Sequence, residues 1–326
     1  MTMERAVRIT EQGGPEVIQW VDVALPAPGP GEVRMRNTAV GLNFIDTYHR
    51  GGVYKMAMPS GLGVEAAGVV EAVGDGVSDY KVGDRVCTFG LAVGAYATAR
   101  NLSAAMLFHV PDDISDEIAA AALLKGCTTE FLVERCATVR AGDVVLVHAA
   151  AGGVGLLLVQ WLKHRGATVI GSVSTEEKAD IARAAGADHI INYATDDTAA
   201  RCRDLTEGKG VRTVFDGVGM DTWEASLKSC QRRGLIISYG NASGPVTGVD
   251  LRAVANAGSL FITRPTLYDY YVDPVERAAG AAQLFDMIRK GVVTVDIRQR
   301  YALADVAQAH RDLEARKTTG STILLP

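Results

Sequence analysis

A glycine-rich turn near the middle of the chain has the residue types and spacing of a phosphate-binding loop. It reads Ala150-x-Gly152-x-x-Gly155 and stands between an apolar run, residues 144–148, and a helix-like stretch, residues 154–164. Glycines at this spacing let the backbone approach a pyrophosphate, which then sits at the helix N-terminus. The alternative is a turn with only a structural role. The predicted cofactor contacts are Gly152, Gly153, Val154 and Gly155.

The type of dinucleotide is read at the end of the next apolar run, residues 168–173. An NAD site usually places Asp or Glu there for the ribose 2′-hydroxyl. This chain has Ser174 instead, with Lys178 four residues later. A serine does not repel a 2′-phosphate, and a lysine offers it a positive charge. Tyr193, at the end of the third strand, can donate from its phenol. The pattern favours NADPH; the alternative is a solvated Lys178 paired with the acids that surround it.

Other residues are weaker candidates. Tyr239-Gly240-Asn241 follows an apolar run and can bring its backbone to the cofactor. His148 ends the strand before the glycine turn and is typical of a hydrogen-bonded core histidine. The six histidines show no metal-ligand spacing. No nucleophile has a base beside it in sequence.

The elements that must position these residues change character along the chain. The first hundred residues predict a compact sheet or partial barrel, because short apolar or alternating runs are separated by Gly and Pro. Ser115 is predicted to cap a helix reaching about Ala137. From Gly142 onward, strands and helices alternate, which predicts a doubly wound parallel sheet. The β runs are Ala6–Thr10, Glu32–Val40, Ala66–Val73, Arg85–Phe89 and Ala95–Ala99. The fold class is therefore α/β, with a second, β-rich domain.

Composition narrows the class of protein. The chain has 326 residues, of which 48% are hydrophobic and 22% charged, as in a globular protein of about two domains. Its net charge of −5 argues against a nucleic-acid partner. The five cysteines are scattered, which predicts reduced thiols and a cytoplasmic protein. No signal peptide stands at the N-terminus, and the longest apolar tract, Val154–Leu162, is too short to cross a membrane.

These motifs carry a family resemblance. The signature around the glycine turn matches at Gly142-Asp143, Leu146, Ala150-Ala151-Gly152-Gly153, Gly155, Gln160 and Lys163. Further matches are Gly13-Gly14-Pro15-Glu16-Val17, Gly41–Tyr48, Gly83–Val86 and Ile262-Thr263-Arg264-Pro265. The chain resembles the quinone oxidoreductases, the zeta-crystallin branch of the medium-chain dehydrogenase/reductase superfamily. The resemblance covers about residues 5–326, and the chain looks much like the bacterial NADPH:quinone reductases.

The resemblance implies a fold and an assembly. A GroES-like catalytic domain is expected from residues 1–124 and 266–326, with an NADPH-binding Rossmann domain, residues 125–265, inserted between them. Active sites in such proteins lie between the two domains, at the carboxyl ends of the parallel strands. The family, together with the apolar run Leu260–Ile262, implies a homodimer joined through an edge strand.

The same resemblance argues against a catalytic metal. Zinc alcohol dehydrogenases of the superfamily have a cysteine ligand near the position of Asn43 and the histidine of a Gly-His-Glu motif as a second ligand. Here that motif reads Gly63-Val64-Glu65. Valine cannot bind zinc and asparagine is a poor ligand. The expected reaction therefore uses no metal.

By resemblance, Asn43, Asp46 and Tyr48 line the nicotinamide end, with Thr128 opposite. Tyr54 and Arg264 are further catalytic candidates beside Tyr48 and Asn43. Thr263, next to Arg264, is a further expected cofactor contact. The alternative for each tyrosine is a packing role with a satisfied hydroxyl.

The function implied is NADPH-dependent reduction of a small-molecule quinone by hydride or electron transfer. One alternative is reduction of an enone or 2-alkenal on the same fold. Another, from a different class, is a structural or RNA-binding protein that keeps NADPH as a vestigial ligand.

Overall fold

The computed structural model describes residues 2–90 and 92–326, which form two compact units. The first unit comprises Met1–Lys125 and Val295–Pro326, and the second comprises Gly126–Thr294. The second boundary falls after Thr294, whereas the division expected from the sequence falls after residue 265. The reason is that the intervening helices pack within the second unit: Tyr271 donates to Glu130 (2.7 Å), and Gln160 donates to the Thr294 carbonyl (3.1 Å).

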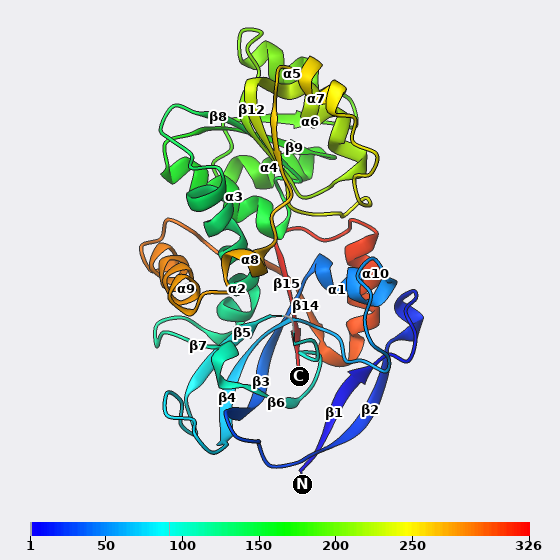
Figure 1. The fold of residues 1–326 in the computed structure, drawn as a ribbon, viewed down its shortest axis with the longest axis vertical. Coiled ribbons are helices and arrows are strands. Elements are labelled where there is room, and N and C mark those ends of the chain that lie inside the picture. Colours follow the sequence, from blue (N-terminus) through cyan, green and yellow to red (C-terminus); the bar gives the residue numbers. More distant parts are fainter. Residues whose placement is uncertain (1, 91) are drawn as a thin grey trace. The chain divides into compact units, whose positions relative to one another are not determined.

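The first unit is built on a seven-stranded sheet with strand order β14-β15-β3-β4-β5-β7, in which β6 also pairs with β3. The C-terminal strand pairs antiparallel with β3, with Ile323 opposite Gly41, so both ends of the chain contribute to one sheet. A two-stranded ribbon of β1 and β2, the helices α1 and α10, and α2 as far as Lys125 complete the unit (Figure 1). The strands are β1 (Thr2–Arg8), β2 (Gln19–Leu25), β3 (Glu32–Leu42), β4 (Glu65–Val73), β5 (Arg85–Phe89), β6 (Ala99–Ser103), β7 (Leu107–His109), β14 (Ile297–Ala302) and β15 (Ser321–Leu325). The helices are α1 (Phe44–Gly51), α2 (Asp116–Glu130) and α10 (Val306–Glu314).

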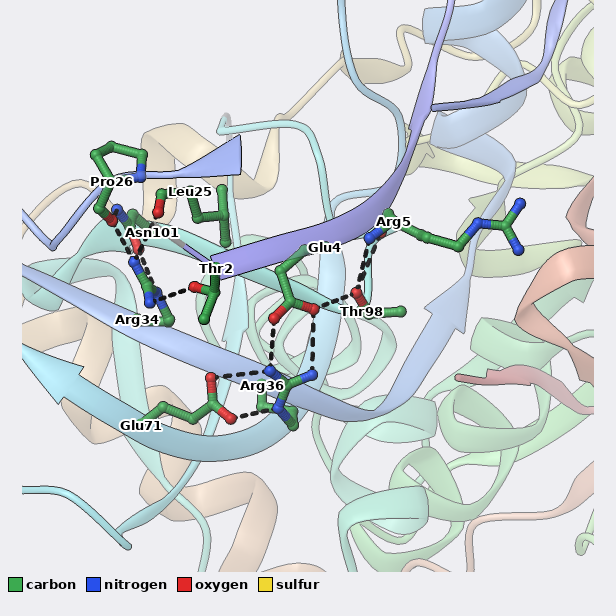
Figure 2. Close-up of polar contacts among 10 residues, drawn as sticks. All are labelled: Thr2, Glu4, Arg5, Leu25, Pro26, Arg34, Arg36, Glu71, Thr98 and Asn101. Carbon is green, nitrogen blue, oxygen red and sulfur yellow. Dashed lines mark hydrogen bonds and ion pairs between the residues drawn. The ribbon is translucent and has the colours of Figure 1, made fainter. Parts of the chain in front are cut away.

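One guanidinium group ties the β1–β2 ribbon to the main sheet. Arg36 on β3 donates to both carboxylate oxygens of Glu4 on β1 (2.7 and 3.2 Å), and it also pairs with Glu71 on β4 (Figure 2). The Thr98 hydroxyl donates to the same Glu4 carboxylate at 2.6 Å. These hydrogen bonds, Arg36's foremost, lower the pKa of Glu4 below its usual value. The buried Glu4 carboxylate is thus held by donors from two neighbouring segments.

The second unit is a doubly wound parallel sheet. Its order is β10-β9-β8-β11-β12-β13, so the chain winds to one side from β8 and to the other from β11. The strand order reverses between β8 and β11, and ligands of such sheets bind at the carboxyl ends of strands at this point. The strands are β8 (Val144–His148), β9 (Thr168–Val173), β10 (His189–Asn192), β11 (Val211–Asp216), β12 (Cys230–Ser238) and β13 (Phe261–Thr263). The helices are α3 (Gly153–His164), α4 (Glu176–Ala184), α5 (Thr198–Leu205), α6 (Trp223–Ser229), α7 (Leu251–Asn256), α8 (Leu267–Tyr270) and α9 (Pro274–Arg289).

Most elements lie where the sequence predicts them, with a few differences in helix caps and strand bounds. Ser115 caps α2 as expected, since its hydroxyl accepts from the Ile118 amide (3.2 Å). The capping-box spacing of Ser174 and Glu177 predicts Ser174 as the cap of helix α4. Thr175 caps it instead, because the Thr175 hydroxyl accepts from the Lys178 amide (3.2 Å). The run at residues 95–99 precedes its strand, and β2 has no predicted counterpart among the runs. All five cysteines are free thiols.

No helix in the described part of the chain is long and apolar enough to cross a membrane.

Candidate functional site

The first group of predicted site residues lies at the N-terminus of α1. Asn43 is the residue before the first turn of this helix, and its backbone amide donates to the Asp46 carboxylate (2.9 Å). The Asn43 side chain points elsewhere: its Nδ2 donates to Glu65 Oε2 at 2.8 Å. Asn43 therefore joins two buried carboxylates, one on α1 and one on β4.

Asp46 ends a chain of buried hydrogen bonds. Its Oδ2 accepts from the Tyr96 hydroxyl (2.9 Å), which lies 3.0 Å from His310 Nε2. Arg50 Nη1 lies 3.0 Å from His310 Nδ1. Because an arginine only donates, Nδ1 must accept, so the Nε2 proton is given to Tyr96 and the Tyr96 proton to Asp46.

Burial is the main influence on the pKa values of these hydrogen-bonded residues. It raises the pKa of Asp46 to about 7, against the opposing hydrogen bonds from Asn43 and Tyr96. Burial, together with the charge of Arg50, lowers the pKa of His310 to about 3, so the imidazole is neutral. Asp46 Oδ1 is buried and has no hydrogen-bond partner among the described residues. Asp46 is fully buried, and its predicted contact with a cofactor remains a prediction.

Glu65 is a second buried carboxylate in this group. Its Oε1 accepts from the Leu124 amide (2.6 Å), and its Oε2 lies 3.6 Å from Lys125 Nζ. Burial raises the pKa of Glu65, and the charge of Lys125 is the largest opposing influence. Val64, beside it, is wholly buried and offers no lone pair. The group is therefore a carboxylate held by an ammonium and two amide donors.

Tyr48 and Tyr54 form one aromatic cluster. Their rings meet edge to face, with centroids 5.6 Å apart, and the His49 ring lies 5.8 Å from that of Tyr54. Gln12 donates to the carbonyls of both His49 and Tyr54 (2.8 Å each), which holds the segment after α1 against the helix. The structure thus brings these two predicted catalytic residues together.

In the second unit, the glycine turn has the geometry of a phosphate-binding loop. Gly152 precedes the first turn of α3, and no side chain caps this helix end. A Cβ on Gly155 would clash with the Ala149 carbonyl, so only glycine allows the helix to start this close to the strand. Gly152, Gly153 and Val154 are partly exposed. Their backbone can therefore approach an anion.

The residues predicted to choose the cofactor lie at neighbouring strand ends. The Tyr193 amide donates to the Val173 carbonyl (2.9 Å), which brings the end of β10 beside Ser174. Lys178 lies in the first turn of α4. Arg183 pairs with Glu176 and Asp180 on the same helix (3.4 and 2.8 Å). Two of the acids near Lys178 are thus already paired with another cation.

Tyr239-Gly240-Asn241 packs against the loop that follows β11. A Cβ on Gly240 would clash with the Gly217 carbonyl, so the two glycines allow a close backbone approach. With its amide oriented to satisfy both groups, Asn241 accepts from Arg264 Nη2 (3.2 Å) and donates to the Gly240 carbonyl (3.0 Å). Thr263, at the end of β13, precedes Arg264.

The predicted site residues fall into two groups. Asn43, Asp46, Tyr48 and Tyr54 belong to the first unit. The second unit carries Thr128, Gly152, Gly153, Val154, Gly155, Ser174, Lys178, Tyr193, Tyr239, Gly240, Asn241, Thr263 and Arg264.

Sequence reasoning missed several polar residues at these places. Tyr96, Lys125 and His310 give no local signal, because their partners are far away in the chain. Asp216 could have been found: it ends an apolar run and is followed by Gly217-x-Gly219, a pattern close to that of the glycine turn.

Comparisons with known proteins agree with this architecture. Residues 29–112 match the alcohol dehydrogenase GroES-like domain, and residues 153–287 match the zinc-binding dehydrogenase family. A quinone oxidoreductase of Pseudomonas aeruginosa is 50% identical over 325 residues, 99% of this chain and all of the relative. A 2-haloacrylate reductase of a Burkholderia species is 46% identical over 333 residues, covering 99% of each chain. The crystal structure of Escherichia coli quinone oxidoreductase complexed with NADPH is 46% identical, covers 99% of this chain and 100% of that chain, and has a TM-score of 0.96.

A GroES-like unit and a Rossmann unit in one chain define a medium-chain dehydrogenase/reductase. Within that superfamily, this chain belongs to the quinone oxidoreductase family. Although one matched family is named for zinc binding, the described residues contain no group of three or more His, Cys, Asp or Glu side chains that could hold a metal ion.

The buried Asp46 predicts a pH-dependent stability. Its pKa is about 7 in the folded protein and 3.8 in the reference state, so folding favours the protonated form and stability is lost as the pH rises from about 4 to 7. Asp46→Asn cannot ionise and should melt close to the wild type at pH 4 but about 5–10 °C higher at pH 8. Melting temperatures of both proteins at the two pH values test this. An equal difference at both values would show that Asp46 does not titrate in this window.

Proposed function

We propose that this protein reduces quinones with NADPH, without a metal. Two features of one sheet carry the proposal. The glycine turn can be this tight only because residue 155 is a glycine, and the next strand ends in Ser174, where NAD enzymes carry an acid. The 50% identical quinone oxidoreductase and the NADPH complex of the E. coli enzyme support it. When bound, NADPH supplies the hydride.

The chain's own residues bind and orient the reactants in this proposal. The amides of Gly152, Gly153 and Val154 receive the pyrophosphate at the start of α3. Ser174, Lys178 and Tyr193 receive the 2′-phosphate. Gly240 and Asn241, with the neighbouring Thr263, contribute to the rest of the dinucleotide site.

The catalytic residues are proposed to act by hydrogen bonding. Asn43 is held by Glu65, and Tyr48 is packed against Tyr54, so both present their polar atoms in fixed orientations. A quinone is a good acceptor and needs only orientation and a proton. Arg264, held by Asn241, can supply a positive charge to an oxygen of the acceptor.

The assay that tests the proposal measures NADPH oxidation by the purified chain with a panel of quinones, before and after treatment with a chelator. We expect quinone-dependent turnover that the chelator does not change, because Asn43 and Val64 cannot form a zinc site. One zinc per chain in elemental analysis would contradict the metal-free mechanism. NADPH binding without turnover on any acceptor would instead indicate a vestigial cofactor.

The choice of cofactor yields the next prediction. Lys178→Ala should raise the KM for NADPH by about 10- to 150-fold, the effect of one charge-assisted contact, and barely change the KM for NADH. Arg183→Ala, on the same helix, is the matched control, because Arg183 pairs with Glu176 and Asp180. If Lys178→Ala weakens both cofactors equally, Lys178 does not read the 2′-phosphate.

A second candidate reaction is reduction of a carbon–carbon double bond conjugated to a carbonyl. The 46% identical 2-haloacrylate reductase favours it. Both reactions deliver hydride conjugate to a carbonyl, so one site can serve both. They differ in the anion that follows, because an enolate needs more stabilisation than a hydroquinone anion.

The variant Tyr48→Phe distinguishes a hydroxyl that orients the acceptor from one that acts as a general acid. If the hydroxyl only orients the acceptor, kcat with a quinone should fall about tenfold, the effect of one hydrogen bond, and kcat with an enone should fall further. General acid catalysis would instead cost about 10²–10⁴. The control is Tyr301→Phe, which removes a hydroxyl bonded to Asp312 (3.0 Å) in the same unit. A quinone loss above a hundredfold would refute the positioning role of Tyr48.

We also propose a homodimer joined through β13. This strand is an edge of the six-stranded sheet, and its Phe261 is 62% exposed and Ile262 37% exposed. An exposed apolar edge is a template for pairing with a second copy. Light scattering should give twice the chain mass of 34.5 kDa, and Ile262→Lys should give the monomer. Val275→Lys, at an exposed position on α9, is the control; a monomeric wild type would overturn the proposal.

A further inference from the structure

Three adjacent strands of the second unit end in buried polar side chains. These are Ser172 near the end of β9, His148 at the end of β8 and Asp216 at the end of β11, and each is at most 1% exposed. His148 and Ser172 are register partners in the sheet. A fourth polar residue, Ser226 from α6, is also wholly buried.

These four side chains form one continuous hydrogen-bond network. His148 Nδ1 lies 2.8 Å from Ser172 Oγ, and His148 Nε2 lies 3.1 Å from Ser226 Oγ. The Ser226 hydroxyl donates to Asp216 Oδ2 at 2.8 Å.

Only one arrangement of protons satisfies this network with a neutral imidazole. The Asp216 carboxylate accepts only, so the Ser226 proton is committed to it. The Ser226 oxygen must then accept from His148 Nε2–H. This leaves His148 Nδ1 as an acceptor for the Ser172 hydroxyl. Burial lowers the pKa of His148, which keeps the imidazole neutral as the network requires.

Asp216 carries the network into the loop after β11. Its Oδ1 accepts from the amides of Val218 (2.9 Å) and Gly219 (3.0 Å), and the Thr222 hydroxyl lies 2.8 Å from both carboxylate oxygens. This loop also meets Gly240, whose close approach to Gly217 excludes any side chain. The position of the loop therefore depends on a carboxylate that His148 orients through Ser226.

Each of the three strands leads to a proposed cofactor-binding segment. The glycine turn follows His148 and Ser174 follows β9, while the Gly217–Gly219 loop after Asp216 packs against the third such segment, Tyr239–Asn241. We propose that His148 is a positioning residue for NADPH: through Ser172, Ser226 and Asp216, it holds the segments after β8, β9 and β11 in the arrangement that receives the dinucleotide. This inference rests on the proposed function, because it assumes that these segments bind NADPH.

The test is the dissociation constant of NADPH, measured by fluorescence titration of the purified full chain without acceptor. His148→Leu removes the donor and the acceptor, and we expect the constant to rise about 10- to 100-fold. His148→Gln restores one donor and one acceptor at similar reach, so the rise should be about threefold or less. Ser226→Ala breaks the same network with a smaller change and carries the test if His148→Leu does not fold.

A matched control separates positioning from general destabilisation. Thr206 is also buried and hydrogen-bonded, to the Cys202 carbonyl (2.6 Å) and from the Gly210 amide (2.8 Å). It lies near the amino end of β11, whereas His148 and Asp216 lie at the carboxyl ends of their strands. Thr206→Val should lower the melting temperature but leave the NADPH constant within about twofold. The KM for a quinone should stay within about twofold in the His148 variants.

The outcomes distinguish this inference from the proposed function. A wild type that binds no NADPH overturns both. A wild type that binds NADPH, with His148→Leu and Ser226→Ala binding it equally well, overturns only the positioning role. The positioning role is also overturned if Thr206→Val loses as much NADPH affinity as His148→Leu when both variants have lost the same stability.

Discussion

Buried carboxylates must be surrounded by hydrogen-bond donors, and this requirement organises the functional part of each unit. Asp46, Glu65 and Asp216 are all fully buried, where an uncompensated charge would be strongly destabilising. Their donors combine local backbone amides with distant side chains: Asn43 and Tyr96 for Asp46, and the amides of Val218 and Gly219 with the Ser226 hydroxyl for Asp216. Satisfying each carboxylate therefore fixes the loops that carry the candidate site.

The two units use this constraint differently. In the first, Asn43 lies between Asp46 and Glu65, so the helix that presents Tyr48 is anchored at its first residue. In the second, Asp216 anchors a loop, and the hydroxyl of Ser226 connects it to His148. A satisfied buried network of this kind rigidifies its surroundings and specifies one geometry of the attached loop. A reaction that needs orientation more than strong acid catalysis is well served by this design.

The parts of the site that depend on local chain geometry could be predicted from the sequence. The glycine turn, the strands β8 and β9, and the start of α2 follow from spacing, apolar runs and a capping serine. The position of the Thr175 cap was missed by one residue, because Ser174 and Thr175 are equivalent by type. Glycine at position 155 was predicted for phosphate access, and the structure adds a second reason, its contact with Ala149.

Long-range partners could not be predicted in the same way. Tyr96 and His310 are 214 residues apart, and Glu65 and Leu124 are 59 apart, so neither pair leaves a periodic or motif signal. His148 shows the same limit. Sequence reasoning gave it a satisfied core role, and the structure agrees that its ring is buried and hydrogen-bonded. The network reaches three strand ends because β9, β8 and β11 are neighbours in the sheet. This strand order cannot be predicted from the local sequence of residues 140–220.

The surroundings of Glu65 show how the proposed metal-free site compensates a buried carboxylate. Where zinc relatives have a histidine before this glutamate, Val64 supplies no lone pair, so the carboxylate needs another counter-charge. Lys125 Nζ, 3.6 Å away, provides it, and the amides of Asn43 and Leu124 complete the set. A fixed ammonium and amides neutralise the carboxylate but cannot polarise an alcohol as zinc does. In the proposed reaction, activation of the acceptor falls to hydrogen-bond donors such as Tyr48, and a quinone or a conjugated double bond, already electron-poor, is a substrate for which such donors suffice.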